Sequence, residues 1–424
     1  MSRILLTPLG STGDVNPFIW IGRLLSEQGH DVTVAANPQF APSIVATGLR
    51  MVPAGTAEEY EELAGNPEIW QSEKGSLQVM RYAGEFVERH FEVIKEEIER
   101  GEKPLLIAPA PAFAARLARE VFGVRLVTVN LQPTAFFSVH DTSVFSRNLA
   151  FVRHLPAWIK RIVFRIASGR MDEAFGDGIE RACRRQGVEP PRSVFREWWQ
   201  SPDGSICLFP EWFCKPQDDW VCRPACPGFP LEDLDRQHGE DRELDSFLDE
   251  GPPPVLFTAG SAMAHGHSFF EAAADACRRL NLRAIFATRF PAQLPAGLPA
   301  TMRQFSYVPF ARALPRCAAM VHHGGIGTTS QALAAGTPQI LMPMAHDQPD
   351  NALRIARLGA GTYIWPGSFS GKNLAETLKR VLSDAALRER CVAIRGMIDR
   401  TQTAKNLAAA LSPFLSDGTP ARSQ

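Results

Sequence analysis

The sequence predicts an α/β protein with two Rossmann-like, doubly wound domains that face a cleft. Residues 4–35 read as a strand, a glycine loop, a helix and a second strand, and such a βαβ unit implies a parallel sheet. A second alternation of apolar strands and helices starts at residue 255. Between the two halves, an acidic stretch ends in prolines at 252–254, a composition typical of a linker.

The elements of the first half follow from apolar runs and helix-ending residues. Runs that read as strands lie at residues 4–7, 31–35, 105–108 and 126–130. Helices are expected from residue 16 or 17 to 28, where Gly29 follows, and at 113–122. We assign residues 1–235 to this first domain.

The second half repeats the alternation. Its expected strands lie at residues 255–258, 284–287, 320–322 and 340–342. We place the linker at 236–254, the second domain at 255–414 and a flexible tail at 415–424.

The composition limits the class of protein. With 424 residues the chain is long enough for about two to three domains of roughly 100 to 200 residues. No stretch approaches the roughly 20 apolar residues of a membrane span, and no cleavable signal precedes the first strand. A net charge of −1 gives no broad basic field for nucleic acid. We therefore expect a cytoplasmic protein that does not bind nucleic acid.

The cysteine and histidine patterns do not indicate a metal site. The closest cysteines are Cys207, Cys214, Cys222 and Cys226, and they lack the paired short spacing of a zinc site. His265 and His267 have no carboxylate at ligand spacing, and Asp233 and Asp235 lie in the acidic linker, where charges are usually solvated. We expect reduced thiols and no bound metal or cofactor.

The strongest functional signal is a glycine-rich turn between a strand and a helix. Residues 322–329 read His-His-Gly-Gly-Ile-Gly-Thr-Thr, and a helix follows to about residue 335. Backbone N–H groups and the positive end of the helix dipole converge in such a turn, where a diphosphate is stabilised. A histidine and the hydroxyl of Thr328 can each donate a further hydrogen bond. Asp347 and Gln348 follow the next strand and can bind sugar hydroxyls.

Other interpretations of these residues stay open. The turn can be purely structural, and Asp347 and Gln348 can act as an N-cap pair before the helix at 352–358. A dehydrogenase is not indicated, because Gly10 and Gly13 lack the spacing of the dinucleotide fingerprint.

Two segments resemble a known family. The loop at residues 10–17 is similar to the acceptor-side loop of GT-B-fold glycosyltransferases, which include plant, macrolide, glycopeptide and sterol enzymes, and residues 322–348 are similar to their donor signature. The resemblance spans nearly the whole chain. Within the family, the sequence resembles most the rhamnosyltransferases of rhamnolipid synthesis. The short sequence motifs that carry this closer resemblance lie at residues 201–204, 207–210, 212–213, 216–217, 219–220, 228–231 and 345–348.

The resemblance implies that Asp14 is the catalytic base that takes a proton from the acceptor hydroxyl. Many plant members have a histidine at this position with a supporting aspartate, but residues 108–111 offer no carboxylate here. A direct aspartate base is therefore expected. The alternative is that Asp14 only stabilises the helix start through the dipole, by about 0.3 to 1 kcal/mol.

The resemblance also implies donor contacts on both sides of the cleft. Ser261 would donate to a phosphate, Tyr307 would stack on the base, and the backbone of Val308 would read the base edge. Gln331 replaces a glutamate that pairs the ribose hydroxyls in UDP-sugar enzymes, which favours a TDP-sugar. Which histidine of the pair bonds the phosphate stays open. The expected donor set is Gly13, Ser261, Tyr307, Val308, His322, His323, Gly325, Gly327, Thr328, Gln331, Asp347 and Gln348.

Large apolar residues after the strands of the first half predict an apolar acceptor. The candidates are Phe18, Trp20, Trp70, Phe136 and Phe137. Each aromatic residue alone is more often part of a core.

Residues 151–170 alternate basic and apolar residues without an acidic one. Such a segment lies on an anionic membrane, or it packs its apolar side inward as a helix, and both interpretations stay open. Membrane contact would place the protein at the inner face of the membrane.

We therefore expect a metal-independent, inverting glycosyltransferase. It would move a hexose, with rhamnose from TDP-rhamnose as one case, to a hydroxyl of an apolar acceptor such as a hydroxy fatty acid lipid. The first alternative is a UDP-glucose-dependent glucosyltransferase of sterols, flavonoids or other natural products. More remote alternatives are a nucleotide-sugar epimerase and a non-catalytic binder. The TDP- or UDP-linked sugar is a co-substrate, and no other cofactor is expected.

Overall fold

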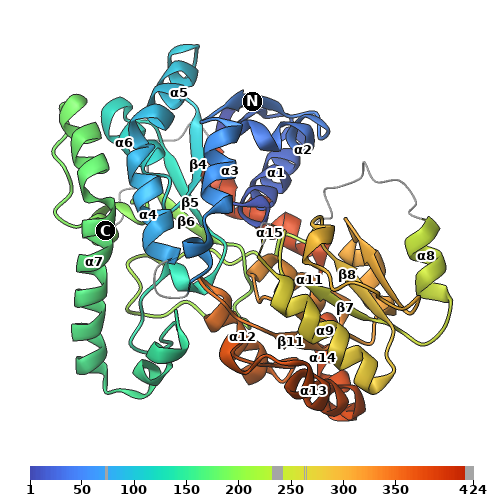
Figure 1. The fold of residues 1–424 in the computed structure, drawn as a ribbon. Coiled ribbons are helices and arrows are strands. Elements are labelled where there is room, and N and C mark those ends of the chain that lie inside the picture. Colours follow the sequence, from blue (N-terminus) through green and yellow to red (C-terminus); the bar gives the residue numbers. More distant parts are fainter. Residues whose placement is uncertain (72–74, 232–241, 262, 264, 416–424) are drawn as a thin grey trace.

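The computed structural model describes residues 1–71, 75–231, 242–261, 263 and 265–415 (Figure 1). Each half contains a six-stranded parallel sheet flanked by helices. The predicted α/β fold with two Rossmann-like domains is confirmed. Within these residues no helix is long and apolar enough to cross a membrane.

The first sheet has the strand order β3-β2-β1-β4-β5-β6. Its strands are β1 (Arg3–Leu6), β2 (Asp31–Ala36), β3 (Arg50–Pro53), β4 (Leu105–Pro109), β5 (Leu126–Asn130) and β6 (Gly204–Cys207). The helices are α1 (Thr12–Glu27), α2 (Ala41–Val45), α3 (Ala57–Gly65), α4 (Gly75–Glu85), α5 (Val87–Glu99), α6 (Phe113–Phe122) and α7 (Ala157–Arg185). Both faces of the sheet are buried, since Leu6 packs in one core with Phe18 and Leu5 in another with Phe113.

The second sheet has the order β12-β11-β10-β7-β8-β9, which is the same topology. Its strands are β7 (Val255–Thr258), β8 (Ala284–Ala287), β9 (Met302–Phe305), β10 (Ala319–His322), β11 (Gln339–Leu341) and β12 (Gly361–Tyr363). The helices are α8 (Arg242–Asp249), α9 (His267–Leu280), α10 (Phe310–Ala313), α11 (Ile326–Ala335), α12 (Gln348–Leu358), α13 (Gly371–Ser383), α14 (Ala385–Arg395) and α15 (Arg400–Leu415).

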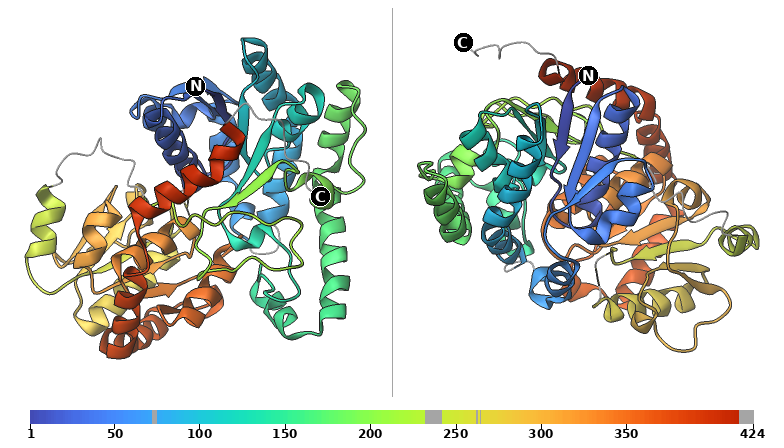
Figure 2. Two further views of the ribbon diagram at one scale, coloured as in Figure 1. Left: turned by 180° about the vertical axis from the view of Figure 1, so that it is seen from behind. Right: turned by 90° about the horizontal axis from the view of Figure 1, so that it is seen from above.

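The structure differs from the predicted domain limits at two helices. Leu244 and Phe247 of α8 share a core with Leu256 of the second sheet, although the linker was expected to extend to residue 254. Leu407 of α15 is buried in the core of the first domain, although the second domain was expected to include it. Figure 2 shows α15, in red, returning to the first domain.

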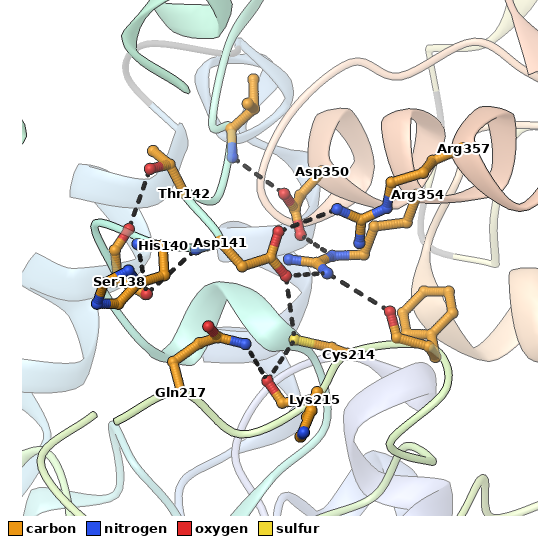
Figure 3. Close-up of polar contacts among 12 residues, drawn as sticks. Ser138, His140, Asp141, Thr142, Cys214, Lys215, Gln217, Asp350, Arg354 and Arg357 are labelled. Carbon is orange, nitrogen blue, oxygen red and sulfur yellow. Dashed lines mark hydrogen bonds and ion pairs between the residues drawn. The ribbon is translucent and has the colours of Figure 1, made fainter. Parts of the chain in front are cut away.

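A buried ion-pair network joins the two domains (Figure 3). Arg354 of α12 donates to Asp141 of the first domain at 2.7 Å and to Asp350 at 2.6 Å. Asp350 also accepts from the Val144 amide at 3.1 Å, and Arg357 reaches Asp141 at 3.1 Å. Burial alone would raise the pKa of Asp141, but the charge of Arg354 lowers it to about 2. The charged network therefore holds α12 against the first domain at neutral pH.

We expect Arg354→Leu to lower the free energy of unfolding by about 3 to 5 kcal/mol, because it leaves buried carboxylates without their cation. Arg357→Leu is the matched control on the same helix. Its side chain is 51% exposed, and such pairs contribute about 0 to 1 kcal/mol. Urea unfolding measures both, and equal losses would contradict this account of the network.

Candidate active site

The two domains meet at a cavity of about 930 Å³. It lies at the carboxyl ends of the central strands, lined by the segments that follow β1, β4, β7 and β10. In each sheet the strand order reverses between two of these strands, and open α/β sheets bind ligands at such points. The cavity is therefore the candidate active site.

Asp14 is held in the first turn of α1, at the cavity. Its Oδ2 accepts hydrogen bonds from the Ser11 amide at 2.8 Å and the Ser11 hydroxyl at 2.9 Å. Its Oδ1 has no hydrogen-bond donor among the residues that the structure describes. Burial raises the pKa of Asp14, and the hydrogen bonds from Ser11 only partly oppose this. A carboxylate with a raised pKa and an unpaired oxygen can accept a proton.

The first turn of α11 presents an anion site to the same cavity. The Ile326 amide donates to Asp347 Oδ2 at 3.0 Å. The next two amides, of Gly327 and Thr328, have no acceptor within the described part of the chain, and both residues line the cavity. Open amides at the positive end of a helix dipole bind anions such as phosphate.

The two histidines before this helix have different environments. His322 is fully buried, its Nε2 is 3.0 Å from Gln339 Oε1, and its Nδ1 accepts from the Gly324 amide at 3.1 Å. His323 lines the cavity, and its Nδ1 is buried with no partner in the described structure. Burial lowers the pKa of His323 to about 4, so the ring is neutral at pH 7 and can donate one N–H. Of the two, His323 is the one that a ligand in the cavity can contact.

Two glycines leave room for the His323 ring. Gly260 has a φ of +105°, and a Cβ there would lie 3.0 Å from His323 Cε1. A Cβ at Gly325 would lie 2.6 Å from His323 Nε2. A larger residue at either position would displace the ring from the cavity wall.

Asp347 changes charge near neutral pH. Its Oδ2 accepts from Asn351 Nδ2 at 2.7 Å as well as from the Ile326 amide. Burial raises the pKa of Asp347 to about 7 despite the hydrogen bond from Asn351, and the charge of Asp14 adds to the rise. The two carboxylates therefore influence each other across the cavity.

The described residues contain no group of three or more His, Cys, Asp or Glu side chains that could hold a metal ion. His265 lies 3.4 Å from the Gly65 carbonyl, and His267 lies 3.0 Å from the Gln293 carbonyl. Asp233 and Asp235 lie outside the described residues.

Several known proteins that this chain resembles in sequence or in fold are glycosyltransferases. Residues 286–417 match the family described as "Erythromycin biosynthesis protein CIII-like, C-terminal domain". The chain is 27% identical over 410 residues to the O-mycaminosyltylonolide 6-deoxyallosyltransferase of Streptomyces fradiae, with 91% of each chain covered. The glycotransferase of kitacinnamycin has a similar fold, with a TM-score of 0.72, 20% identity and coverage of 98% of this chain and 99% of that one. The spinosyn rhamnosyltransferase SpnG, solved with thymidine diphosphate, has a TM-score of 0.67, 16% identity and coverage of 96% and 99%.

The chain has the GT-B fold and is a glycosyltransferase. The predicted GT-B fold is thereby confirmed, and a nucleotide-sugar donor follows from the class of enzyme.

Nearly all predicted donor residues of the glycosyltransferase line the cavity, and His322 is the exception. Those in the lining are Gly13, Ser261, Tyr307, Val308, His323, Gly325, Gly327, Thr328, Gln331, Asp347 and Gln348. Gln331 Oε1 is buried without a partner among the described residues, so it can take a hydrogen bond from a ligand. Gln348 Oε1 instead accepts from the Met344 and Ala345 amides at 2.8 and 3.2 Å, which holds its own loop.

The aromatic residues predicted for the acceptor are placed differently. Trp20 lines the cavity. Phe18 is fully buried in the core of the first domain, because it lies on the inner face of α1, so its assignment was wrong. The side chain of Trp70 lies outside the described part.

Phe136 and Phe137 were also assigned wrongly to the acceptor. Phe136 is 3% exposed and stacks on Trp220 with ring centroids 4.0 Å apart. Phe137 stacks on Phe164 of α7 at 5.0 Å. Both rings have protein partners and are absent from the cavity lining.

Helices α3, α4 and α5 line the first-domain side of the cavity with residues that sequence reasoning missed. Among them are Tyr60, Val79, Tyr82, His90 and Ile94. In the sequence these residues show only helical spacing. The buried face of any amphipathic helix has the same spacing, so it does not distinguish cavity-lining residues from core residues.

We expect His323→Ala to weaken binding of a nucleoside diphosphate by about 10 to 150-fold, since a hydrogen bond to a charged group contributes roughly 1.5 to 3 kcal/mol. His322→Ala should mainly lower the melting temperature, because Gln339 and the Gly324 amide lose their buried partner. Calorimetry and thermal unfolding separate the two effects. The reverse pattern would show that His322 is the nucleotide contact.

The pKa of Asp347 predicts a pH-dependent stability. The folded-state pKa lies above the ordinary value of 3.8, so the folded protein holds this proton more tightly than the unfolded chain. The raised pKa of Asp347 therefore lowers the stability of the folded protein. This loss is fully present above about pH 7 and disappears as the pH falls toward about 4. We expect Asp347→Asn to melt higher than the parent at about pH 8 and similarly at about pH 4. A melting difference that does not change with pH would contradict this assignment.

Proposed function

We propose that this glycosyltransferase moves a hexose to a hydroxyl of an apolar acceptor, with inversion at the anomeric carbon and without a metal ion. One observation carries the proposal. Asp14, with its unpaired oxygen, and the open amides of α11 line one cavity from opposite domains. A base on one side and an anion site on the other are what the transfer requires.

Asp14 would accept the proton of the acceptor hydroxyl while that oxygen attacks the anomeric carbon. The bond from this carbon to the diphosphate oxygen breaks, and the nucleoside diphosphate leaves with the electron pair. The amides of Gly327 and Thr328 and one N–H of His323 supply hydrogen bonds to the departing charge. Attack and departure on opposite faces of the sugar give inversion.

A TDP-sugar is the favoured donor. Gln331 offers a neutral amide with an unpaired, buried oxygen at the place where UDP-sugar enzymes carry a carboxylate for the ribose hydroxyls. The similarity to a rhamnosyltransferase solved with thymidine diphosphate supports this donor and makes rhamnose a candidate sugar. UDP-glucose is the alternative.

The acceptor is proposed to be apolar because side chains such as Val79 and Ile94 line its part of the cavity. A hydroxy fatty acid lipid, as in rhamnolipid synthesis, is one candidate, and for it we also propose peripheral contact with lipid at the inner face of the membrane. A sterol, flavonoid or other natural-product aglycone is the alternative. Similarity to the Streptomyces fradiae enzyme supports the natural-product class.

An epimerase or a non-catalytic binder are the remaining alternatives. An epimerase acts on the sugar alone and leaves the acceptor side of the cavity without a role. Sugar epimerisation without an acceptor would favour it. Donor binding with neither transfer nor slow donor hydrolysis would favour a binder.

We expect Asp14→Asn to lower turnover by about 100 to 10,000-fold and to leave nucleotide affinity nearly unchanged, because the amide has the same shape but cannot take a proton. Ser11→Ala is the matched control, since it removes one hydrogen bond to Asp14 and keeps the base. Near-normal turnover of Asp14→Asn at saturating donor and acceptor would refute the assignment.

Transfer is expected to survive exhaustive chelation, because hydrogen-bond donors from α11 and His323 are proposed to stabilise the leaving group. The measurement compares initial rates before and after EDTA treatment. Loss of activity that one divalent ion restores would contradict the metal-independent mechanism.

A further inference from the structure

Exposed apolar side chains gather on one surface of the first domain. Of ten large apolar side chains that are exposed in the described residues, five lie between residues 149 and 166, which is far from an even spread. They come from the turn η4 (Arg147–His154) and the first half of α7. They are Leu149, Phe151, Trp158, Ile162 and Ile166, with exposed fractions of 47%, 59%, 63%, 49% and 58%. We name this set the α7 face.

The stripe on α7 does not pack inward. Trp158, Ile162 and Ile166 are four residues apart and therefore lie on one side of the helix. Another side faces the protein, where Lys160 is buried and donates to the Val139 carbonyl at 2.9 Å and Phe164 stacks on Phe137. The inward-packing interpretation of residues 151–170 is wrong for the stripe.

Arginines accompany the stripe and no acid neutralises them. Arg161 and Arg165 are exposed and lie one turn from apolar stripe residues, and Arg170 follows. Their side chains have no ion-pair partner within the described residues. Residues 142–171 contain no Asp or Glu. The surface is therefore both apolar and positively charged.

Helix α7, whose first half carries the α7 face, packs through its second half on a helix that lines the cavity. Helix α7 forms the outer edge of the first domain in Figure 1. Its second half packs tightly on α4, because a Cβ on Gly178 would clash with the Gly84 carbonyl. Helix α4 in turn supplies Val79 and Tyr82 to the cavity.

We propose that the α7 face docks the enzyme on an anionic lipid bilayer. The apolar side chains would enter the acyl region, and the arginines would lie at the lipid phosphates. The inference rests on the proposed function in one respect, which is the apolar acceptor. If that acceptor is held in the membrane, docking through the α7 face would bring the enzyme to it.

Charge favours a bilayer over a second copy of this chain. In a symmetric pair formed through this face, the same surface would meet itself, so the arginines of both copies would approach each other, and residues 142–171 supply no Asp or Glu to pair with them. An anionic bilayer presents the opposite charge together with an apolar interior.

The test is co-sedimentation of the full chain, without donor or acceptor, with phosphatidylglycerol-containing vesicles and with pure phosphatidylcholine vesicles. We expect binding to the anionic vesicles that weakens with salt. Trp158→Ser/Ile162→Ser/Ile166→Ser should lose at least about 10-fold in affinity. Arg161→Gln/Arg165→Gln should lose about 25-fold, at roughly 5-fold for each charge.

The matched control is Val392→Ser/Met397→Ser, which removes apolar side chains that are 62% and 54% exposed in and just after α14, a helix of the other domain that lies away from α7 in Figure 1. It should bind vesicles like the parent. Equal binding by the α7 variants, or no binding by the parent, would overturn the inference. So would parent self-association that the α7 variants abolish while vesicles stay unbound.

Transfer to a water-soluble acceptor, measured on the same proteins, keeps the two proposals apart. We expect the α7 variants to retain it, because none of the changed residues lines the cavity. If no variant or parent transfers sugar but the vesicle result holds, the proposed function fails and the docking surface stands.

Discussion

The N-terminus of α11 requires negative charge, and the rest of the site depends on that requirement. Its Ile326 amide is satisfied inside the protein by Asp347, whereas the Gly327 and Thr328 amides open into the cavity. A diphosphate there would accept hydrogen bonds from these open amides at the start of α11. It would lie at the same helix end as the Asp347 carboxyl, which is only partly ionised near neutral pH. Burial keeps the pKa of Asp347 high, and the charge of Asp14 adds to the rise. We therefore propose that donor binding at α11 and proton transfer at Asp14 influence each other through Asp347.

The cavity also depends on how the domains are held. Neither domain contains both the proposed base and the proposed anion site, so the proposed transfer requires the carboxyl ends of the two sheets to face each other. Arg354 fixes α12 to Asp141, and α12 begins immediately after Asp347. In addition, α15 returns to the first core through Leu407. These contacts hold α12 of the second domain against the loop of the first domain that carries Asp141.

Sequence reasoning succeeded where a local pattern is sufficient. The central strands are continuous apolar runs because both faces are buried, and the glycines of the α11 turn mark it in the sequence. The edge strands β3, β6, β9 and β12 were missed because they carry polar or small residues, as in Met302–Phe305. Which of two adjacent histidines faces the cavity depends on Gln339, 17 residues later, and the acceptor side depends on helix packing across the fold. No local pattern encodes either.

The most direct test of this account is a crystal structure of the protein with thymidine diphosphate. The account predicts diphosphate oxygens within about 3 Å of the Gly327 and Thr328 amides, with a His323 ring nitrogen at hydrogen-bond distance and His322 still bonded to Gln339. Asp14 should remain across the cavity, on the side where the sugar would project. A diphosphate bound away from the first turn of α11, or held by His322, would contradict it.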